Sequence, residues 1–293
     1  MERTDQLELP IAEDEFVYPG HTACPGCSAV LAMRLVLKAL GPRTIMVIPP
    51  GCSGPIAGGF PISALKIPTL RIAFGTTASS ASGIRAALNS TGKKNINVLA
   101  WAGDGATLDI GLAALSSAAE RNDDIIYVCY DNEAYMNTGV QKSSSSPEGA
   151  WTTTTPDSKN TPKKDIVGIM AAHKIPYIAT ASVGYPKDLV GKMDKAKKIR
   201  GTKFIYIFSP CAIGWRYPSE LTIRVAKLAT QTGIFPLYEI EDGERYILNR
   251  KRGKKPLKEY ISLQGRFRNL DNQGLRRLEA WVDKRWDFLE RMI

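Results

Sequence analysis

The sequence has 293 residues, of which 44% are hydrophobic and 23% are charged, a balance that is typical of globular chains and excludes an intrinsically disordered one. Its net charge of +10 is uneven, because residues 245–293 contain 14 Lys and Arg against 6 Asp and Glu, whereas residues 1–244 contain 25 against 23. The acidic N-terminus has no apolar segment of the signal-peptide type, and the five cysteines are an odd number, so we expect a cytoplasmic protein without a disulfide framework.

Short apolar strands alternate with helices along the chain. After an irregular lead-in over residues 1–20, we expect a helix at 27–40, a strand at 45–48, a loop at 49–68, a helix in the second half of 73–88, a strand at 97–101 and a helix at 108–121. The series continues with a strand at 125–130, a polar loop at 143–164, a helix at 166–173, a strand at 177–181, a helix at 187–198, a strand at 204–208 and helices at 218–232 and 274–292. This order predicts an α/β fold with a mostly parallel twisted sheet and helices on both faces.

The longest charge-free run, Thr44–Leu65, is the one candidate for a membrane span. It contains four prolines and four glycines, which no continuous helix tolerates. We therefore expect no membrane association.

The basic C-terminal part is expected to differ in role from the rest of the chain. We divide the sequence into a ligand-binding domain, 1–240, and a basic extension, 241–293. A solvated surface or a nucleic-acid patch are alternatives for the extension, but Trp281 and Trp286 fit a packing helix better than base stacking. We expect docking onto sister subunits, with steering of an acidic electron carrier as a secondary role, and no nucleic-acid partner.

Two segments that follow strands carry ligands for a cation. Gly103-Asp104-Gly105 follows the strand at 97–101, and Asp131-Asn132 follows the strand at 125–130. Glycines let the backbone approach a phosphate, and carboxylate and amide oxygens suit Mg²⁺. Because ligands bind beyond the carboxyl ends of parallel strands, the segments predict one Mg²⁺-phosphate site. A plain Gly-Asp-Gly turn is the alternative, whereas the Rossmann and Walker motifs are absent.

Four cysteines lie at positions where they could share one metal centre. Cys24 and Cys27 form a Cys-x-x-Cys pair at a helix start, Cys52 lies in the Pro- and Gly-rich loop, and Cys211 follows the strand at 204–208. The spacing is compatible with an iron–sulfur cluster, with zinc, or with a reduced pair and unrelated cysteines. Cys129 lies within an apolar strand, and we expect it in the core.

Several motifs together resemble the β subunit of pyruvate:ferredoxin oxidoreductase. The resemblance covers about residues 16–270. It is carried by Gly103-Asp104-Gly105 and by five further runs, namely Gly20-His21-x-x-Cys24-x-Gly26-Cys27, Tyr130–Gly139, Trp151–Pro156, Ser209–Cys211 and Leu263–Phe267. It implies a thiamine diphosphate-binding fold over the domain 1–240, with cluster-binding loops.

The resemblance also implies the cofactor ligands. A 4Fe-4S cluster would be bound by Cys24, Cys27, Cys52 and Cys211. Mg²⁺ would be bound by the side chains of Asp104 and Asn132 and by the carbonyl of Ala134. The diphosphate and thiazolium would be wrapped by Gly103, Asp104, Gly105 and Ala106 and by Asn132, Glu133, Ala134, Tyr135, Met136 and Asn137, with Ala29 and Cys52 nearby. Asn137 would face the substrate, and His21 is a further candidate for contact with the cluster loop.

The implied activity is the coenzyme A-dependent oxidative decarboxylation of a 2-oxoacid, with pyruvate expected first. Branched-chain 2-oxoacids, 2-oxoglutarate and oxalate are alternatives, because the run Phe74–Ala78 lacks the acidic residue and asparagine that pyruvate enzymes carry after the phenylalanine. The implied partners are an α subunit that supplies the activating glutamate, γ and ferredoxin-like δ subunits, and ferredoxin. A non-redox thiamine decarboxylase subunit leaves the four cysteines unexplained, and a zinc-stapled interaction module leaves the Mg²⁺ motif unexplained.

Overall fold

The computed structural model describes residues 13–59 and 61–293, so the first twelve residues of the expected lead-in and Phe60 lie outside the described part. The strands are β1 (Thr44–Ile48), β2 (Thr69–Arg71), β3 (Asn97–Gly103), β4 (Ile126–Asp131), β5 (Tyr177–Ser182), β6 (Lys203–Phe208), β7 (Tyr238–Glu241) and β8 (Arg245–Leu248). The α-helices are α1 (Ser28–Leu40), α2 (Ser53–Ala57), α3 (Thr77–Ser90), α4 (Leu112–Glu120), α5 (Ile166–Ala172), α6 (Pro186–Lys198), α7 (Ala212–Trp215), α8 (Thr222–Gln231), α9 (Leu257–Ile261) and α10 (Asn272–Met292). Three short turns complete the elements, namely the π-helical η1 (Gly105–Asp109) and the 3₁₀-helical η2 (Ser219–Leu221) and η3 (Gly265–Phe267).

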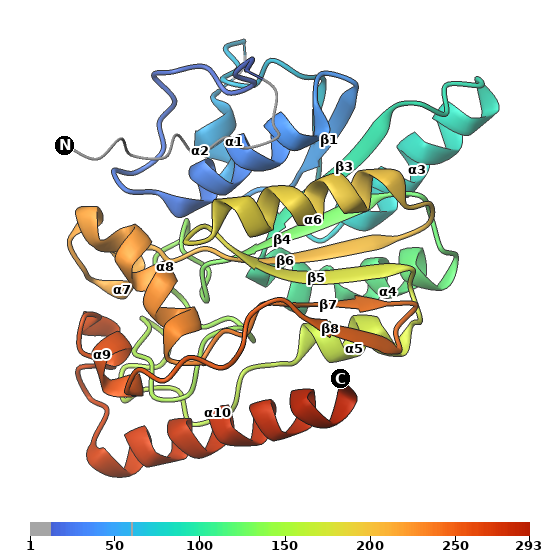
Figure 1. Cartoon of the computed structure of the whole chain (residues 1–293). Coiled ribbons are helices and arrows are strands. Elements are labelled where there is room, and N and C mark those ends of the chain that lie inside the picture. The colour runs from blue at the N-terminus through green and yellow to red at the C-terminus, as the bar shows by residue number, and fades with distance from the viewer. Residues whose placement is uncertain (1–12, 60) are drawn as a thin grey trace, which may run out of the picture.

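The described strands form one eight-stranded sheet in the order β2-β1-β3-β4-β6-β5-β7-β8. The six strands from β2 to β5 in this order run parallel, whereas β7 pairs antiparallel with β5, and β8 pairs antiparallel with β7. In Figure 1, α1 and α6 lie on one face of the sheet, and α3, α4, α5 and α10 lie on the other. The predicted α/β architecture is therefore confirmed.

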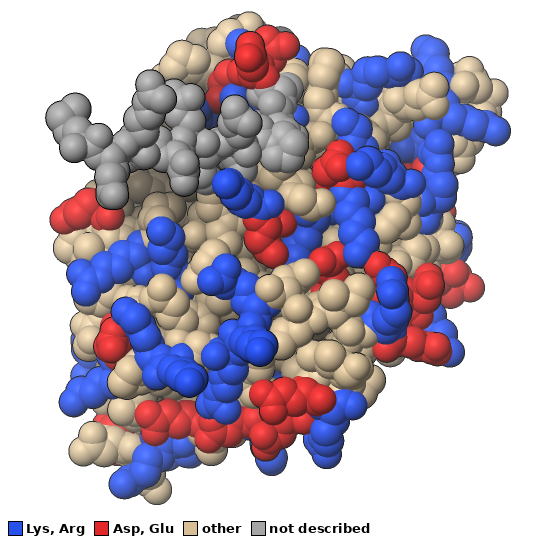
Figure 2. Space-filling model, viewed as in Figure 1, with Lys and Arg blue, Asp and Glu red and all other residues tan. Residues whose placement is uncertain are grey.

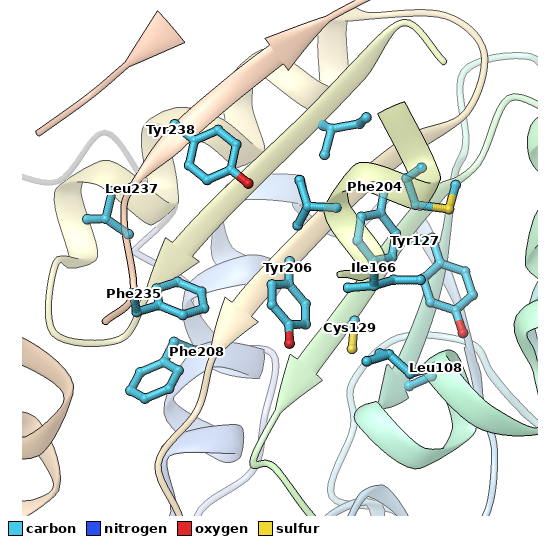
Figure 3. Close-up of a cluster of buried hydrophobic side chains, with 14 of the residues drawn as sticks. Leu108, Tyr127, Cys129, Ile166, Phe204, Tyr206, Phe208, Phe235, Leu237 and Tyr238 are labelled. Atoms are coloured by element: carbon cyan, nitrogen blue, oxygen red, sulfur yellow. The ribbon is translucent and has the colours of Figure 1, made fainter. Parts of the chain in front are cut away.

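The central strands are buried on both faces, and each face has its own core. Along β6, Phe204, Tyr206 and Phe208 point to the face of α4 and α5, while Ile205 and Ile207 point to the face of α1 and α6. Figure 3 shows the aromatic row of β6 beside Cys129 of β4. Cys129 is fully buried, as its position in an apolar strand predicts. This two-sided burial explains why these strands read as continuous apolar runs.

Several elements differ from the prediction, and the short helices α7 and α9 are also absent from it. The expected loop 49–68 contains α2, and β2 follows directly after it. The antiparallel hairpin β7–β8 has no counterpart in the predicted order. The expected helix 108–121 begins earlier, as η1, and then continues as α4. Gly111 stands between the two parts, where an added Cβ would come within 2.0 Å of the Ala106 carbonyl oxygen.

Residues after 241 belong to the same sheet and core as the rest of the chain. They supply β8, and the apolar face of α10 packs into the core on the α4 face through Leu278, Val282, Trp286 and Leu289. Trp286 donates a hydrogen bond through Nε1 to the Gly233 carbonyl at 2.8 Å. The apolar face of α10 is thus covered by its own chain, so a partner would meet the charged face of this helix. Among the described residues, none of the helices combines the length and apolarity that a bilayer span requires.

Candidate functional site

Two adjoining cavities lie where the parallel strands end. The first has a volume of 190 Å³ and is lined by the loops after β1, β3 and β4. Its walls include most of the residues that the sequence nominated for the cofactor, namely Cys52, Gly103, Asp104, Gly105, Ala106, Asn132, Ala134, Tyr135, Met136 and Asn137. The strand ends therefore bring the Gly-Asp-Gly and Asp-Asn segments to one site.

The three expected Mg²⁺ ligands converge in this first cavity. The side-chain oxygen of Asn132 lies 3.0 Å from Oδ1 of Asp104 and 2.8 Å from the carbonyl oxygen of Ala134, an approach that a bound cation would explain. Three oxygens then face one point, which is a donor set that suits Mg²⁺.

The surroundings of the Asp104 carboxylate favour a bound cation. Asp104 is buried, and its Oδ2 accepts a hydrogen bond from Ser143. Burial, followed by the repulsion of the Asp131 carboxylate, raises the pKa of Asp104 well above its ordinary value, although the Ser143 hydrogen bond and the charge of Lys163 act in the opposite direction. A bound divalent cation would remove this penalty, so the electrostatics of the site fit Mg²⁺.

Asp131 and Glu133 fix the loop that carries Asn132. Asp131 accepts hydrogen bonds from Ser145 at 2.6 Å and from the Glu133 backbone N–H at 3.0 Å, and it forms an ion pair with Lys163. Glu133 has a φ of 64° and pairs with Lys163 at 2.8 Å and with Arg266 at 2.7 Å. Burial by itself raises the pKa of Glu133, but the two cations outweigh it and hold the pKa below its ordinary value.

The side chain of Glu133 consequently points away from the first cavity, among whose lining residues it is not found. Its predicted contact with the cofactor has no direct support in this geometry, whereas its buried ion pairs position Asn132 and Ala134. On the other side of the loop, the Trp215 indole donates to the Asn132 carbonyl oxygen at 2.7 Å.

A short hairpin presents Met136 and Asn137 to the cavity. The N–H of Tyr135 donates to the Gln141 carbonyl at 2.9 Å, and the N–H of Val140 donates back to the Tyr135 carbonyl at 3.0 Å. The threonine-rich segment supports this hairpin, because Thr153 donates from its backbone to Val140 at 3.0 Å. The hairpin holds the backbone of Asn137 at the cavity mouth.

Gly105 is required by the packing of the site. An added Cβ would come within 2.3 Å of the Tyr135 ring, which lies over the start of η1. The Tyr135 hydroxyl donates to Asp109 at 2.9 Å at the end of the same turn. The ring and the turn are therefore locked together, and the N-terminal N–H groups of the turn border the cavity, where a diphosphate would be favoured.

The four candidate cysteines line the second cavity, which has a volume of 250 Å³. Cys27, Cys52 and Cys211 are the N-cap residues of α1, α2 and α7, and Cys24 lies one turn before Cys27. The Cys211 sulfur accepts a hydrogen bond from the Gly214 N–H at 3.3 Å. Backbone N–H groups at helix starts favour an anionic thiolate or a negatively charged cluster.

Burial favours the protonated thiol over the thiolate at Cys52 and Cys211 when no metal is bound. Burial, together with the nearby charges of Cys211 and Cys27, raises the pKa of Cys52 to about 12, and burial raises the pKa of Cys211 to about 11. Within residues 13–59 and 61–293, no three His, Cys, Asp or Glu side chains are grouped closely enough to hold a metal ion by themselves. The side chains share a cavity, and a cluster would have to draw the sulfurs together and displace their protons.

The two cavities share a wall made of Cys52, Asn132 and Asn137. Ala29 lines the cysteine cavity and not the first one. Neither cavity is lined by His21, whose Nδ1 accepts a hydrogen bond from the Ala23 N–H at 3.4 Å. His173 ends α5 and bonds to Ser116 at 3.0 Å, away from the site.

Several residues that support the site were not singled out from the sequence. Ser143, Ser145 and Lys163 come from the polar loop 143–164, and Arg266 comes from the late Leu263–Phe267 run. The threonine run and the late Gln-Gly-Arg run were recognised only as part of the resemblance, with no role assigned. Their roles depend on contacts between distant segments, which local pattern does not reveal.

The sequence is similar to known proteins over nearly its whole length. Residues 26–207 match the family model described as thiamine pyrophosphate enzyme, C-terminal TPP binding domain. The ketoisovalerate oxidoreductase subunit VorB of Pyrococcus abyssi is 50% identical, over 98% of this chain and 96% of its own. The pyruvate synthase subunit PorB of Methanothermobacter thermautotrophicus is 46% identical, over 94% of this chain and 97% of its own.

The fold is similar to that of a solved enzyme. A chain of the 2-oxoglutarate:ferredoxin oxidoreductase from Magnetococcus marinus superposes with a TM-score of 0.60 at 20% identity, over 74% of this chain and 82% of that one. At this identity the similarity concerns the fold, which is the thiamine diphosphate-binding α/β fold. The family model and the two relatives account for the Gly-Asp-Gly and Asp-Asn loops after β3 and β4. The chain belongs to the family of 2-oxoacid:ferredoxin oxidoreductase β subunits.

Proposed function

We propose that this chain is the thiamine diphosphate- and cluster-binding subunit of a 2-oxoacid:ferredoxin oxidoreductase that acts with coenzyme A. The observation that carries the proposal is the wall shared by the two cavities. This wall consists of Cys52, Asn132 and Asn137. The cavity on one side of it contains Asp104 and Ala134, and the cavity on the other side contains the remaining three cysteines. A non-redox decarboxylase would need the first cavity but not the second.

Asp104, Asn132 and the Ala134 carbonyl are proposed to hold Mg²⁺, and η1 is proposed to receive the diphosphate. Cys24, Cys27, Cys52 and Cys211 are proposed to hold a 4Fe-4S cluster. When bound, thiamine diphosphate supplies the electron sink for decarboxylation, and the cluster accepts electrons one at a time. The chain's own part is to fix the Mg²⁺ ligands through Lys163 and Arg266 and to exclude water.

The walls of the first cavity favour an aliphatic 2-oxoacid. Phe74, Met136, Tyr130 and Tyr135 are the large apolar side chains of this wall. Asp104 is the one ionisable acid or base among the described lining residues other than Cys52 and the tyrosines. Without a Lys, Arg or His in that wall, this subunit offers no partner for the second carboxylate of 2-oxoglutarate. Pyruvate and branched-chain 2-oxoacids remain as substrates that the wall can accept.

The chain is proposed to work only in a complex. No glutamate lines the first cavity among the described residues, so the group that activates the aminopyrimidine has to come from elsewhere. We assign it to an α subunit, and we assign onward electron transfer to a ferredoxin-like δ subunit and ferredoxin, with a γ subunit completing the assembly. The charged face of α10 and the basic segment 250–258 are the proposed docking surfaces of the C-terminal extension.

The test is a reconstitution assay. The chain is mixed with its sister subunits, and dye reduction dependent on coenzyme A is measured with pyruvate, branched-chain 2-oxoacids, 2-oxoglutarate and oxalate. We expect activity with an aliphatic acid, only after mixing, and only with iron and sulfide bound. Full activity of the isolated chain, or a complex that decarboxylates without electron transfer, would overturn the proposal.

A further inference from the structure

A third cavity lies at the opposite end of the sheet from the proposed site. It has a volume of 540 Å³ and opens at the amino ends of β1, β3, β4 and β6. Strands of six residues place it about 20 Å from the cofactor loops at the usual rise of about 3.3 Å per residue. It is therefore no extension of the first two cavities.

The lining of this third cavity is strongly basic. Seven of its residues are basic, and Asp124 is its one acidic residue among those described. The basic residues are Arg43, Arg85, Lys94, Lys197, Lys198, Arg200 and Lys203. Lys and Arg side chains also gather at the upper right of the molecule in Figure 2, over the ends of α3 and α6.

Asp124 cannot balance this charge. Its carboxylate already pairs with Lys203 at 2.6 Å and with Arg200 at 2.9 Å. Lys198 is paired with Asp194 outside the cavity. In the part of the chain that the structure describes, Arg43, Lys94 and Lys197 form no ion pair, so the rim carries uncompensated positive charge. A concave surface of one sign concentrates ions of the opposite sign.

Arg85 lies at the floor of the cavity, and its guanidinium is held in one orientation. It extends from α3, is only 5% exposed, and donates to the backbone carbonyls of Asp124 at 2.8 Å and of Ile96 at 2.6 Å. These two bonds hold the guanidinium rigidly. Its third nitrogen, Nη1, is buried and has no hydrogen-bond partner among the described residues. An unpaired buried N–H group of a cation is costly, and an anionic oxygen would satisfy it.

We propose that this third cavity binds a phosphate-bearing compound of nucleotide size, with one phosphate oxygen on Nη1 of Arg85 and further phosphates on Lys94 and Arg43. A guanidinium fixed at the floor and exposed Lys and Arg side chains at the rim match a phosphate chain better than they match a single carboxylate. A bound ligand would contact α3, α6 and the loops before β1 and β3. The site is independent of the decarboxylation proposed above, and the two proposals stand or fall separately.

The test is calorimetric titration of the full chain with tripolyphosphate and with ADP. Thiamine diphosphate and Mg²⁺ are present at saturation, so that the cofactor loops are occupied, and ionic strength is constant. We expect one saturable site whose affinity falls by about tenfold or more in the double variant Arg43→Glu/Lys94→Glu, because two attractive charges become repulsive. Both residues are exposed, so the variant is expected to fold.

Lys254→Glu is the matched control, since Lys254 is exposed and lies outside the cavity. Its affinity is expected to change by less than about twofold because distant surface charges are screened by salt. The variant Arg85→Lys keeps the charge but removes the fixed fork, and it is expected to weaken binding by about fivefold or more. Tighter binding of ADP than of tripolyphosphate would identify a nucleotide, and equal binding would identify the phosphate chain alone. Absence of saturable binding, binding no tighter than that of sulfate, or equal weakening in Lys254→Glu would overturn the proposal.

Discussion

The guanidinium of Arg266 lies 2.7 Å from the carboxylate of Glu133, and both side chains are buried. The same guanidinium lies over the Trp215 ring, 3.5 Å from its centroid, and Trp215 bonds to the Asn132 carbonyl. Arg266, which lies near the C-terminal end of the sequence, thus holds the proposed Mg²⁺-binding loop through both Glu133 and Trp215.

Arg266→Met is therefore expected to destabilise the protein by about 3 kcal/mol or more, because it leaves the Glu133 charge with Lys163 as its one remaining cation. The free energy of unfolding in urea measures the effect. Arg276→Met, at an exposed position of α10, is the control and should leave stability nearly unchanged. A loss below about 0.5 kcal/mol for Arg266→Met, the range of ordinary surface substitutions, would contradict the structural role.

Asp104→Asn is expected to abolish retention of Mg²⁺ and thiamine diphosphate while leaving the apoprotein at least as stable as the wild type at pH 7. The asparagine keeps the shape and the bond to Ser143 but removes a buried carboxyl group whose pKa is raised when no cation is bound. Cofactor content after gel filtration and thermal melting of the apoprotein measure the two effects. Asp157→Asn, on the exposed part of the polar loop, should change neither. Normal cofactor retention by Asp104→Asn would remove Asp104 from the site.

Serine at Cys24, Cys27, Cys52 or Cys211 is expected to reduce iron and acid-labile sulfide, because each cysteine supplies one wall of the 250 Å³ cavity. Cys129→Ser is the internal control. Its side chain is buried in β4 beside Tyr206, away from that cavity, so iron should be retained even though stability falls. Zinc without sulfide in the wild type would contradict the cluster assignment.

Glu239 should give the protein a pH-dependent stability. It accepts hydrogen bonds from Lys195 at 2.6 Å, Tyr177 at 2.7 Å and Asn249 at 2.7 Å. Burial by itself raises the pKa of Glu239, but these hydrogen bonds outweigh it and lower the pKa below its ordinary value. The unfolded chain then binds more protons than the native chain just below the ordinary pKa of about 4.3.

The stabilisation from Glu239 is consequently present above about pH 4.3 and is lost as the pH falls through the lowered native pKa. Glu239→Gln is expected to be less stable than the wild type by about 1–2 kcal/mol at pH 7, and the gap should close on acidification. Glu279→Gln, at an exposed position of α10 without an ion pair among the described residues, should show no such gap. Parallel stability curves for wild type and Glu239→Gln would refute this.

The sequence was sufficient to predict which loops meet, where that depends on two parallel strands ending at the same edge of the sheet. Asp104 and Asn132 each follow a parallel strand, and adjacent parallel strands must end at the same edge, so their meeting was predictable. The grouping of Cys211 with Cys52 came from the resemblance instead, because β1 and β6 are not neighbours in the sheet. Strand order could not place Lys163, because a lysine in a loop of serines and threonines is normally solvated. Here its side chain is only 10% exposed and pairs with Asp131 and Glu133. The hairpin β7–β8 was missed because its two four-residue strands are too short to show a clear period.

The position of α10 affects how the protein can fold. Trp286 belongs to the same core as Val47 of β1, so that core is complete only when distant parts of the described chain have come together. Folding therefore requires loop closure over a long separation, which makes it slow. During synthesis, the cysteine loops are made before α10. Until α10 has been synthesised, the apolar residues that it covers stay exposed, and the nascent chain would depend on chaperones to avoid aggregation.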